Sequence, residues 1–229
     1  MPWVPPIRLK EVESGMAGVT IALRIENPRG FRLAADLTLP PGHGPFPAVV
    51  CVHDPSEGKE SPIYRQLAGV LVGQGMAVML LDLTGQGQSD GGPEDATAEA
   101  QMEDVGAALE ELERRPDVDA QRVGGYGAGG AALPLVLRAE GDPRLRALVL
   151  RCPRPGGAFD ALRKVALPTL LIVGAGDRAA LEDALAIDEA LVGEKRVVVA
   201  PEIDCYPTDL AYMQQAAVLA ADWFRKHLV

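Results

Sequence analysis

A glycine-rich stretch in the middle of the chain, Arg122–Leu137 (RVGGYGAGGAALPLVL), has the pattern of a buried strand that turns directly into a helix. In α/β enzymes such a turn commonly carries a catalytic or ligand-binding group. This turn contains no Ser, Cys, Thr or Asp. Two interpretations follow: a loop that binds phosphate through its backbone amides, or a nucleophile turn whose nucleophile has been lost.

The glycine spacing allows a dinucleotide-binding loop, because Gly125, Gly127 and Gly130 match G-x-G-x-x-G. That fingerprint normally opens its domain and is followed, about 20 residues later, by an acidic residue that binds the ribose. Here several predicted strands precede the turn, and Leu150 and Arg151 stand at the ribose position. We therefore rank dinucleotide binding third among the functions considered and expect no cofactor.

The elements around this turn alternate between strands and helices. Two alternating segments, Val19–Ile25 and Phe31–Leu39, fit an antiparallel hairpin with one wet face, and six nearly continuous apolar runs fit strands buried on both faces. These runs are Pro47–His53, Met76–Leu83, Arg122–Tyr126, Ala147–Arg151, Pro168–Gly174 and Lys195–Ala200, and the helical stretches are Ser61–Val72, Ala98–Arg115, Gly130–Ala139, Ala179–Leu191 and Asp209–Leu228. The pattern predicts one α/β domain over residues 1–229, a doubly wound, mainly parallel sheet of about eight strands flanked by helices.

The order of motifs along the chain resembles the α/β-hydrolase superfamily, and it looks closest to the dienelactone-hydrolase-like branch. VCVHDP and the later DLTGQGQSDGG resemble the two loops that precede the nucleophile strand, and DAQRVGGYGAGGAAL resembles the nucleophile turn itself. PTLLIVGAGD resembles the strand that ends at the catalytic acid, and EKRVVVAPEIDCY resembles the segment that holds the histidine. In this family the nucleophile, the acid and the histidine follow one another in that order.

The resemblance assigns the three triad positions residue by residue. The nucleophile position falls on Gly129, seven residues after Arg122, and a second register would place it at Gly127. The acid position falls on Asp177 and the histidine position on Cys205. Two of the three catalytic side chains are therefore absent, which implies a degenerate triad. Removing triad members typically lowers turnover by about 10⁴ to 10⁶.

The resemblance also locates the oxyanion hole, the pair of amides that binds the developing negative charge. One donor is the N–H of Gly130, and the other position falls on Pro55, which has no N–H. The amide of Asp54 is the alternative donor, although its carboxylate would repel an oxyanion. His53 is a structural residue in this family.

Other roles for these residues are simpler. We expect Cys205 to be a packing thiol rather than a nucleophile, and Asp177 to cap the helix that follows it. Arg151 is expected to pair with a carboxylate ligand or with Asp177. Glu202 and Asp204 lie beside Cys205 without a histidine at useful spacing, so we expect no metal site.

The composition excludes some partners. A net charge of −10, with 32 acidic and 22 basic residues, argues against nucleic acid, and no apolar run is long enough for a membrane span. Three widely spaced cysteines, an odd number, fit a reducing compartment better than a disulfide framework. We therefore expect a cytoplasmic protein and leave a homo-oligomer open.

The sequence thus predicts a pseudoenzyme, a hydrolase-fold protein impaired in the usual triad mechanism that binds a small molecule or a partner. The alternative is an active ester or thioester hydrolase with a rebuilt site, using Cys205, Cys51 or Ser56. Restored turnover in a variant with Ser at position 129 and His at position 205 would support the loss of an ancestral triad.

Overall fold

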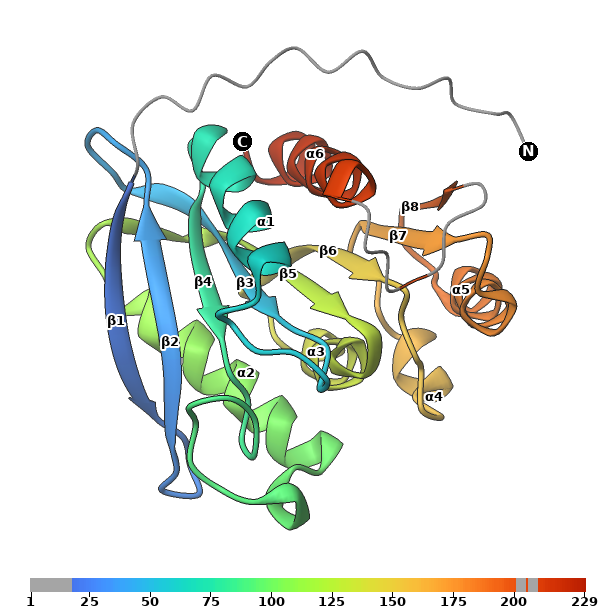
Figure 1. The fold of residues 1–229 in the computed structure, drawn as a ribbon, viewed down its shortest axis with the longest axis horizontal. Helices are drawn as coiled ribbons and strands as arrows, with labels where there is room; N and C mark the ends of the chain where they lie inside the picture. Colours follow the sequence, from blue (N-terminus) through green and yellow to red (C-terminus); the bar gives the residue numbers. More distant parts are fainter. Residues whose placement is uncertain (1–17, 201–204, 206–209) are drawn as a thin grey trace.

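The chain forms one eight-stranded sheet covered by helices on both faces (Figure 1), in a computed structural model that describes residues 18–200, 205 and 210–229. The strands are β1 (Val19–Glu26), β2 (Arg32–Leu39), β3 (Phe46–Val52), β4 (Ala77–Leu81), β5 (Val118–Ala128), β6 (Leu145–Arg151), β7 (Thr169–Gly174) and β8 (Lys195–Ala200). The helices are α1 (Pro62–Gly73), α2 (Ala98–Glu113), α3 (Ala132–Ala139), α4 (Phe159–Leu162), α5 (Arg178–Ala190) and α6 (Leu210–Leu228).

The sheet has the order β1-β2-β4-β3-β5-β6-β7-β8. The β1–β2 hairpin is antiparallel, with Val19 opposite Leu39, and β2 pairs antiparallel with β4. All other neighbouring strands are parallel. This arrangement confirms the predicted mainly parallel sheet with an opening hairpin. No helix in the described part of the chain is long and apolar enough to cross a membrane.

Two apolar cores lie on the opposite faces of the sheet. One packs α1 and α6 against the strands, and the other packs α2 to α5, as Figure 1 shows. The inner strands β3, β4, β6 and β7 are buried almost completely along their length, and β5 is buried from Val123 onward. The catalytic edge of such a sheet is the line of carboxyl ends of its parallel strands.

The centre of the sheet is thin because β5 carries glycines where the helices approach most closely. A Cβ atom at Gly124 would lie 2.5 Å from the ring of Phe224 in α6, and one at Gly125 would lie 2.7 Å from Leu135 in α3. The two glycines therefore allow helices to pack on both faces of the same strand. Helix packing explains this part of the glycine-rich stretch without a bound phosphate.

The structure corrects two boundaries near this turn. The strand predicted to end at Tyr126 continues to Ala128, and a 3₁₀ turn over Gly129–Ala131 precedes α3. The short helix α4 was not predicted, because four residues carry too little periodicity to be recognised. The predicted start of the last helix at Asp209 lies outside the described residues.

Candidate active site

The turn from β5 into α3 has the backbone of a nucleophile turn. Gly129, the first residue after the strand, has a φ of +55°, and the chain then enters the 3₁₀ turn and α3. Residues other than glycine rarely adopt this left-handed backbone conformation, and they do so only where the surrounding structure imposes it. Of the two registers considered, the left-handed residue is Gly129 and not Gly127.

The space above Gly129 is filled by a carboxylate from a neighbouring strand end. A Cβ atom at Gly129 would lie only 1.6 Å from Oδ2 of Asp54, the second residue after β3. Oδ1 of this carboxylate accepts bonds from the Ser56 amide (3.0 Å) and the Ser56 hydroxyl (2.6 Å). These bonds hold the side chain in place, and Asp54 is only 5% exposed. A nucleophile side chain at position 129 and this carboxylate position exclude each other.

The first oxyanion amide is also occupied by Asp54. The N–H of Gly130 donates to Oδ2 of Asp54 at 3.4 Å. Unpaired amides at the start of a helix attract negative charge, which explains why a carboxylate is stable at this position. The carboxylate thus stands where the negative oxygen of a reaction intermediate would stand.

The second oxyanion amide is used by a tyrosine. The Asp54 N–H donates to Oη of Tyr64 in α1 at 2.9 Å, and burial raises the pKa of this phenol, so its hydroxyl is neutral. Pro55 has no N–H, and its ring packs against the turn, 3.3 Å from where a Cβ of Gly130 would lie. Both candidate amides of the oxyanion hole are therefore bonded within the protein.

His53 is buried next to this loop, and both of its ring nitrogens are hydrogen-bonded. Its Nε2 lies 2.9 Å from Oδ1 of Asp82, and its Nδ1 lies 2.9 Å from the Asp54 carbonyl oxygen. Burial opposes ionisation of Asp82, yet hydrogen bonds from His53 and from the amides of Gln88 and Lys59 lower its pKa below the ordinary value. The pair ties the end of β3 to the loop after β4.

Asp177, which the resemblance assigns to the acid position, caps a helix. Its Oδ1 accepts a bond from the Ala180 N–H at 3.0 Å, and the residue is the N-cap of α5. This is the capping role that the sequence predicted. The predicted pairing of Arg151 with Asp177 is wrong, because the contacts of the buried Arg151 side chain lie elsewhere.

Arg151 extends from the end of β6 into a buried polar cluster. Its Nε donates to Oη of Tyr126 (3.2 Å), its Nη2 to Oη of Tyr64 (3.4 Å), and its Nη1 to the carbonyl oxygen of Cys205 (2.8 Å). The side chain is 2% exposed, and among the described residues the carboxylate that approaches it is that of Glu57, with Oε2 4.0 Å from Nη2. Arg151 therefore links the loop after β8 to α1.

Cys205 is bonded to Cys152 in a disulfide, which corrects the prediction of a packing thiol. The end of β6 and the loop after β8 lie at the same edge of the sheet, with the two Cα atoms 5.7 Å apart, a separation that suits a disulfide. The argument from cysteine number for a reducing compartment therefore fails. The odd cysteine is Cys51, which is buried in β3 and whose thiol pKa burial raises.

The rebuilt-site alternative needed an accessible nucleophile. Cys205 is held in the disulfide, Cys51 is buried with a raised pKa, and the Ser56 hydroxyl donates to the Asp54 carboxylate. A serine whose proton goes to a carboxylate lacks the imidazole base of a triad. Among the described residues no group of three His, Cys, Asp or Glu side chains could hold a metal ion, and Glu202 and Asp204 lie outside them.

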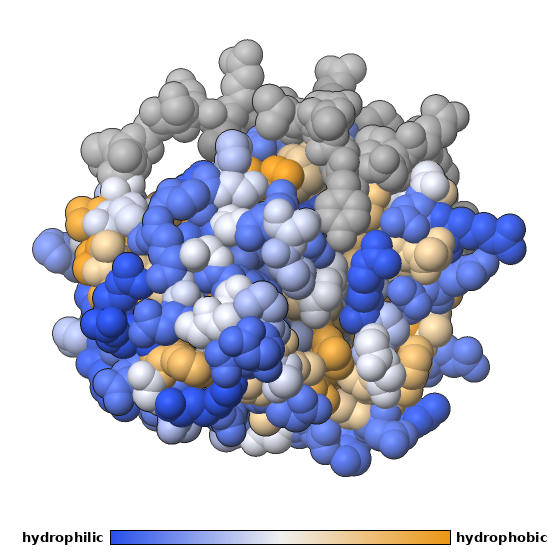
Figure 2. All heavy atoms as spheres, turned by 60° about the horizontal axis from the view of Figure 1, so that its bottom comes forward, coloured by the Kyte–Doolittle hydropathy of each residue, from blue (hydrophilic) through white to orange (hydrophobic). Residues whose placement is uncertain are grey.

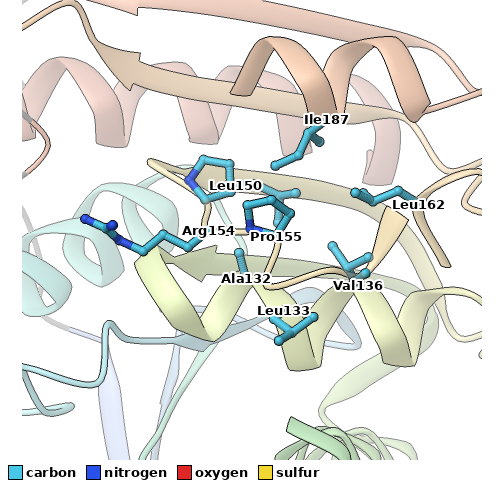
Figure 3. A pocket seen from close by; sticks show the side chains of 10 residues that line it. Ala132, Leu133, Val136, Leu150, Arg154, Pro155, Leu162 and Ile187 are labelled. Atoms are coloured by element: carbon cyan, nitrogen blue, oxygen red, sulfur yellow. The ribbon is translucent and has the colours of Figure 1, made fainter. Parts of the chain in front are cut away.

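An apolar pocket lies on the other side of the turn, between α3, α4, α5 and the loop after β6 (Figure 3). Val136, Leu150, Leu162 and Ile187 converge on it, whereas the guanidinium of Arg154 extends away. The Arg154 N–H donates to the carbonyl oxygen of Gly129 at 3.1 Å, so the wall of the pocket is fastened to the turn itself.

The mainly parallel eight-stranded sheet, its opening antiparallel hairpin and the helices on both faces define an α/β-hydrolase-fold protein. The dienelactone hydrolase from Anabaena variabilis superposes with a TM-score of 0.83 and 26% identity, over 93% of this chain and all of that one. The esterase Est1E from Butyrivibrio proteoclasticus, solved with ferulic acid, shares the fold at 18% identity, with a TM-score of 0.79 over 90% of this chain and 99% of that one.

Within this class, residues 29–164 match the model of the X-Pro dipeptidyl-peptidase (S15) family, which is more than half of the chain, and the chain belongs to that family. A protein named putative phosphoribosyl transferase from Mycobacterium tuberculosis is 31% identical over 98% of this chain and 48% of its own length. The chain thus spans about half the length of that curated relative. A thiohydrolase from Arthrinium phaeospermum is 31% identical over 42% of this chain and 31% of its own length.

Proposed function

We propose that this protein is a pseudoenzyme with the α/β-hydrolase fold, whose hydrolytic site is closed by its own side chains and whose role is to bind a ligand. The observation that carries the proposal is the position of Asp54, with Oδ2 1.6 Å from where a Cβ of residue 129 would lie. A substrate carbonyl has no nucleophile to meet at that point.

Loss of the oxyanion hole adds a second barrier to hydrolysis. Removing one donor from such a hole typically costs about 2.7 to 4 kcal/mol in the barrier. Here the Gly130 amide faces the Asp54 carboxylate and the Asp54 amide faces Tyr64. A developing oxyanion would meet a negative charge instead of two free donors.

The apolar pocket beside the turn is the hollow to which we assign the ligand. It is lined by aliphatic side chains, as ligand sites in proteins commonly are, but its volume is about 10 Å³, so these side chains have to move apart to admit even a small apolar group. On the face of the molecule in Figure 2, hydrophobic surface is confined to small areas among hydrophilic side chains.

Hydrolysis of activated short-chain esters and labelling by a fluorophosphonate test the proposal. We expect neither turnover nor labelling, with the Anabaena dienelactone hydrolase assayed in parallel as an active protein of the same fold. Ester turnover that disappears when Ser56 or Asp54 is replaced would contradict the proposal. Turnover that disappears on thiol alkylation would favour the rebuilt-site alternative, and we expect none because the remaining thiol of Cys51 is buried.

We further infer that the ligand-binding role is exercised beside a phosphoribosyl transferase unit. The support is the architecture of the Mycobacterium relative, in which this chain accounts for only 48% of the length. The glycine turn here is unsuited to phosphate, since its Gly130 amide faces a carboxylate.

Titration calorimetry with 5-phosphoribosyl diphosphate, NAD⁺ and NADP⁺ should therefore show no binding to this chain alone. Size-exclusion chromatography should show a complex with the unmatched part of the Mycobacterium relative, added as a separate chain. Binding of either dinucleotide would instead favour the dinucleotide-binding alternative. A lack of any complex would contradict the proposed partner.

A further inference from the structure

We infer that the Cys152–Cys205 disulfide controls the closure of the oxyanion site: the site is closed while the disulfide is intact and opens when a dithiol reduces it. The inference concerns the same site as the proposed function and rests on that proposal for its biological meaning. It is carried by a continuous set of contacts that joins the disulfide to the Gly130 amide.

The first contact joins the disulfide to Arg151. The chain neighbour of Arg151 is Cys152, and the disulfide brings the Cys205 carbonyl to 2.8 Å from Nη1 of Arg151. The sulfur atoms lie in a small core with Val173 and Ala184, both of which are fully buried. Two thiols need more room than a bonded pair of sulfurs, and a close-packed core gives none. Reduction must therefore displace the Cys205 backbone from the guanidinium.

The second contact joins Arg151 to the oxyanion loop. Nη2 of Arg151 and the N–H of Asp54 both donate to the hydroxyl oxygen of Tyr64, at 3.4 and 2.9 Å. The Tyr64 hydroxyl therefore connects the Arg151 guanidinium to the Asp54 amide. Arg151 and Tyr64 are buried, so water does not replace either contact while the site is closed.

A second acceptor for Arg151 is already present. Oε2 of Glu57 lies 4.0 Å from Nη2 and, among the described residues, has no hydrogen-bond partner although it is buried. When the Cys205 carbonyl withdraws, the guanidinium turns to this carboxylate, because a bond between two charged groups is stronger than its present bond to a neutral hydroxyl. The proposed switch thus uses two arrangements of the side chain, the present one and one turned to Glu57.

The last contact is the one that closes the site. Asp54 presents its carboxylate to the Gly130 amide only while its loop keeps the present position, in which Tyr64 holds the Asp54 amide. Release of Tyr64 frees that amide. The loop from Asp54 to Ser56, whose internal bonds to the carboxylate are kept, can then move as a unit and carry the carboxylate away from Gly129. Reduction thus exposes the two amides of the oxyanion hole to solvent or to an anionic ligand.

The chemical step is an ordinary thiol–disulfide exchange. A dithiol attacks one sulfur, the S–S bond breaks, and the second thiol of the reductant displaces the remaining protein thiol. The two electrons and two protons end on Cys152 and Cys205, and the reductant becomes a disulfide. Because both cysteines are buried, the attack needs local opening, so the response is slow and requires sustained reducing conditions.

Backbone amide exchange, followed by NMR before and after treatment with dithiothreitol, tests the inference. We expect the amides of Asp54 and Gly130 to exchange at least about tenfold faster after reduction, while the amide of Val50 in the middle of β3 is unchanged. Alkylation and mass measurement confirm that two thiols have formed. Unchanged exchange at Asp54 and Gly130 in fully reduced protein overturns the switch. Faster exchange at Val50 as well means general unfolding and also overturns it.

Two variants make the result specific. Tyr64→Phe keeps the disulfide and removes the hydroxyl, so its Asp54 amide should exchange rapidly before reduction and show no further change after it. Cys51→Ala removes the thiol that is not in the disulfide and should respond like the wild type. A reduction response of the Asp54 amide that persists in Tyr64→Phe contradicts the route through this hydroxyl.

Ester turnover, measured in the same samples, separates this inference from the proposed function. Turnover in the oxidised protein overturns the proposed function and leaves the exchange result to decide the switch. Absence of turnover together with unchanged exchange overturns only the switch.

Discussion

The two sides of the candidate site are closed in different ways. On the nucleophile side, Gly129 has no side chain and the Asp54 carboxylate fills the space through hydrogen bonds alone. On the acid and histidine side, Asp177 caps α5 and Cys205 is held covalently by Cys152. The first side is closed by contacts that one substitution removes, whereas the second is closed by a bond that needs reduction.

The difference shows that restoring the missing residues is not enough to restore the site. A serine at position 129 conflicts with Asp54, and a histidine at position 205 leaves Cys152 without a partner. The simple restoration of Gly129→Ser with Cys205→His is therefore expected to fail unless Asp54 is shortened as well.

Among the changes that test this comparison, removal of the disulfide should lower the free energy of unfolding the most. Its cysteines are 53 residues apart in sequence, and closing a loop of this length stabilises a fold by about 4 kcal/mol. Cys152→Ser/Cys205→Ser should lower the free energy of unfolding by about that amount in urea titrations. A loss below about 1 kcal/mol would show that the covalent bond adds little to the packing of this side.

Gly129→Ser should be the next most disruptive change, lowering the free energy of unfolding by about 3 kcal/mol, because it combines backbone strain with displacement of Asp54. Gly129→Ser/Asp54→Gly should recover more than half of the loss. The matched control is Gly75→Ser, since Gly75 has a φ of +83° but nothing within 4 Å of its Cβ position. If the control is destabilised as much as Gly129→Ser, the carboxylate is not the obstacle.

Asp142, just after the C-terminal end of α3, is a buried carboxylate away from the candidate site, and its effect on stability can be measured by acid titration. Burial opposes ionisation of Asp142, but hydrogen bonds from Arg144 and Arg138 lower its pKa to about 2. Because the folded pKa lies below the ordinary value of 3.8, the contribution to stability is present above about pH 4 and is lost as the pH falls towards 2. Asp142→Asn should remove about 2 kcal/mol at pH 7 and abolish that part of the acid dependence.

The same variant should leave exchange at the Asp54 and Gly130 amides unchanged, because Asp142 lies beyond the C-terminal end of α3. A change at those two amides would show that the whole helix, and not the local contacts, holds the site closed.

The smallest effect should come from Asp177→Ala. Loss of an N-cap typically costs about 1 kcal/mol, and Thr97→Ala in α2, whose hydroxyl accepts from the Ala100 N–H, should cost about the same. Equal losses in thermal unfolding, without any change in ligand binding, would identify Asp177 as a cap only. A loss of ligand binding in Asp177→Ala but not in Thr97→Ala would show that Asp177 contributes to the functional site.

The sequence predicted the fold because each strand and helix carries its own periodicity. The buried runs at Pro47–His53 and Pro168–Gly174 match β3 and β7 closely, and the alternating segments match the hairpin. The four residues of α4 were missed because their helix depends on packing against α3 and α5. Gly129 was found because its position relative to Arg122 follows the family pattern.

The closure of the site was harder to foresee. The direction of the Asp54 side chain is set by two bonds to Ser56, and a loop of this kind leaves no periodic signal. The disulfide did leave a signal: Cys152 follows a strand end, Cys205 follows the last strand, and parallel strands end at the same edge of a sheet. The odd number of cysteines argues against a disulfide framework, whereas the placement of Cys152 and Cys205 in the fold favours a bond between them.

The glycines of β5 bear on the backbone of the turn. Because Gly124 and Gly125 let Phe224 and Leu135 press on the strand from both faces, the strand is clamped just before it reaches Gly129. The left-handed turn is therefore fixed by the packing of α3 and α6, whatever side chain the turn carries. The backbone of the turn therefore does not depend on the residues around it, and an engineer who seeks a new activity here can change Asp54 and its neighbours without rebuilding the strand and helices that support Gly129.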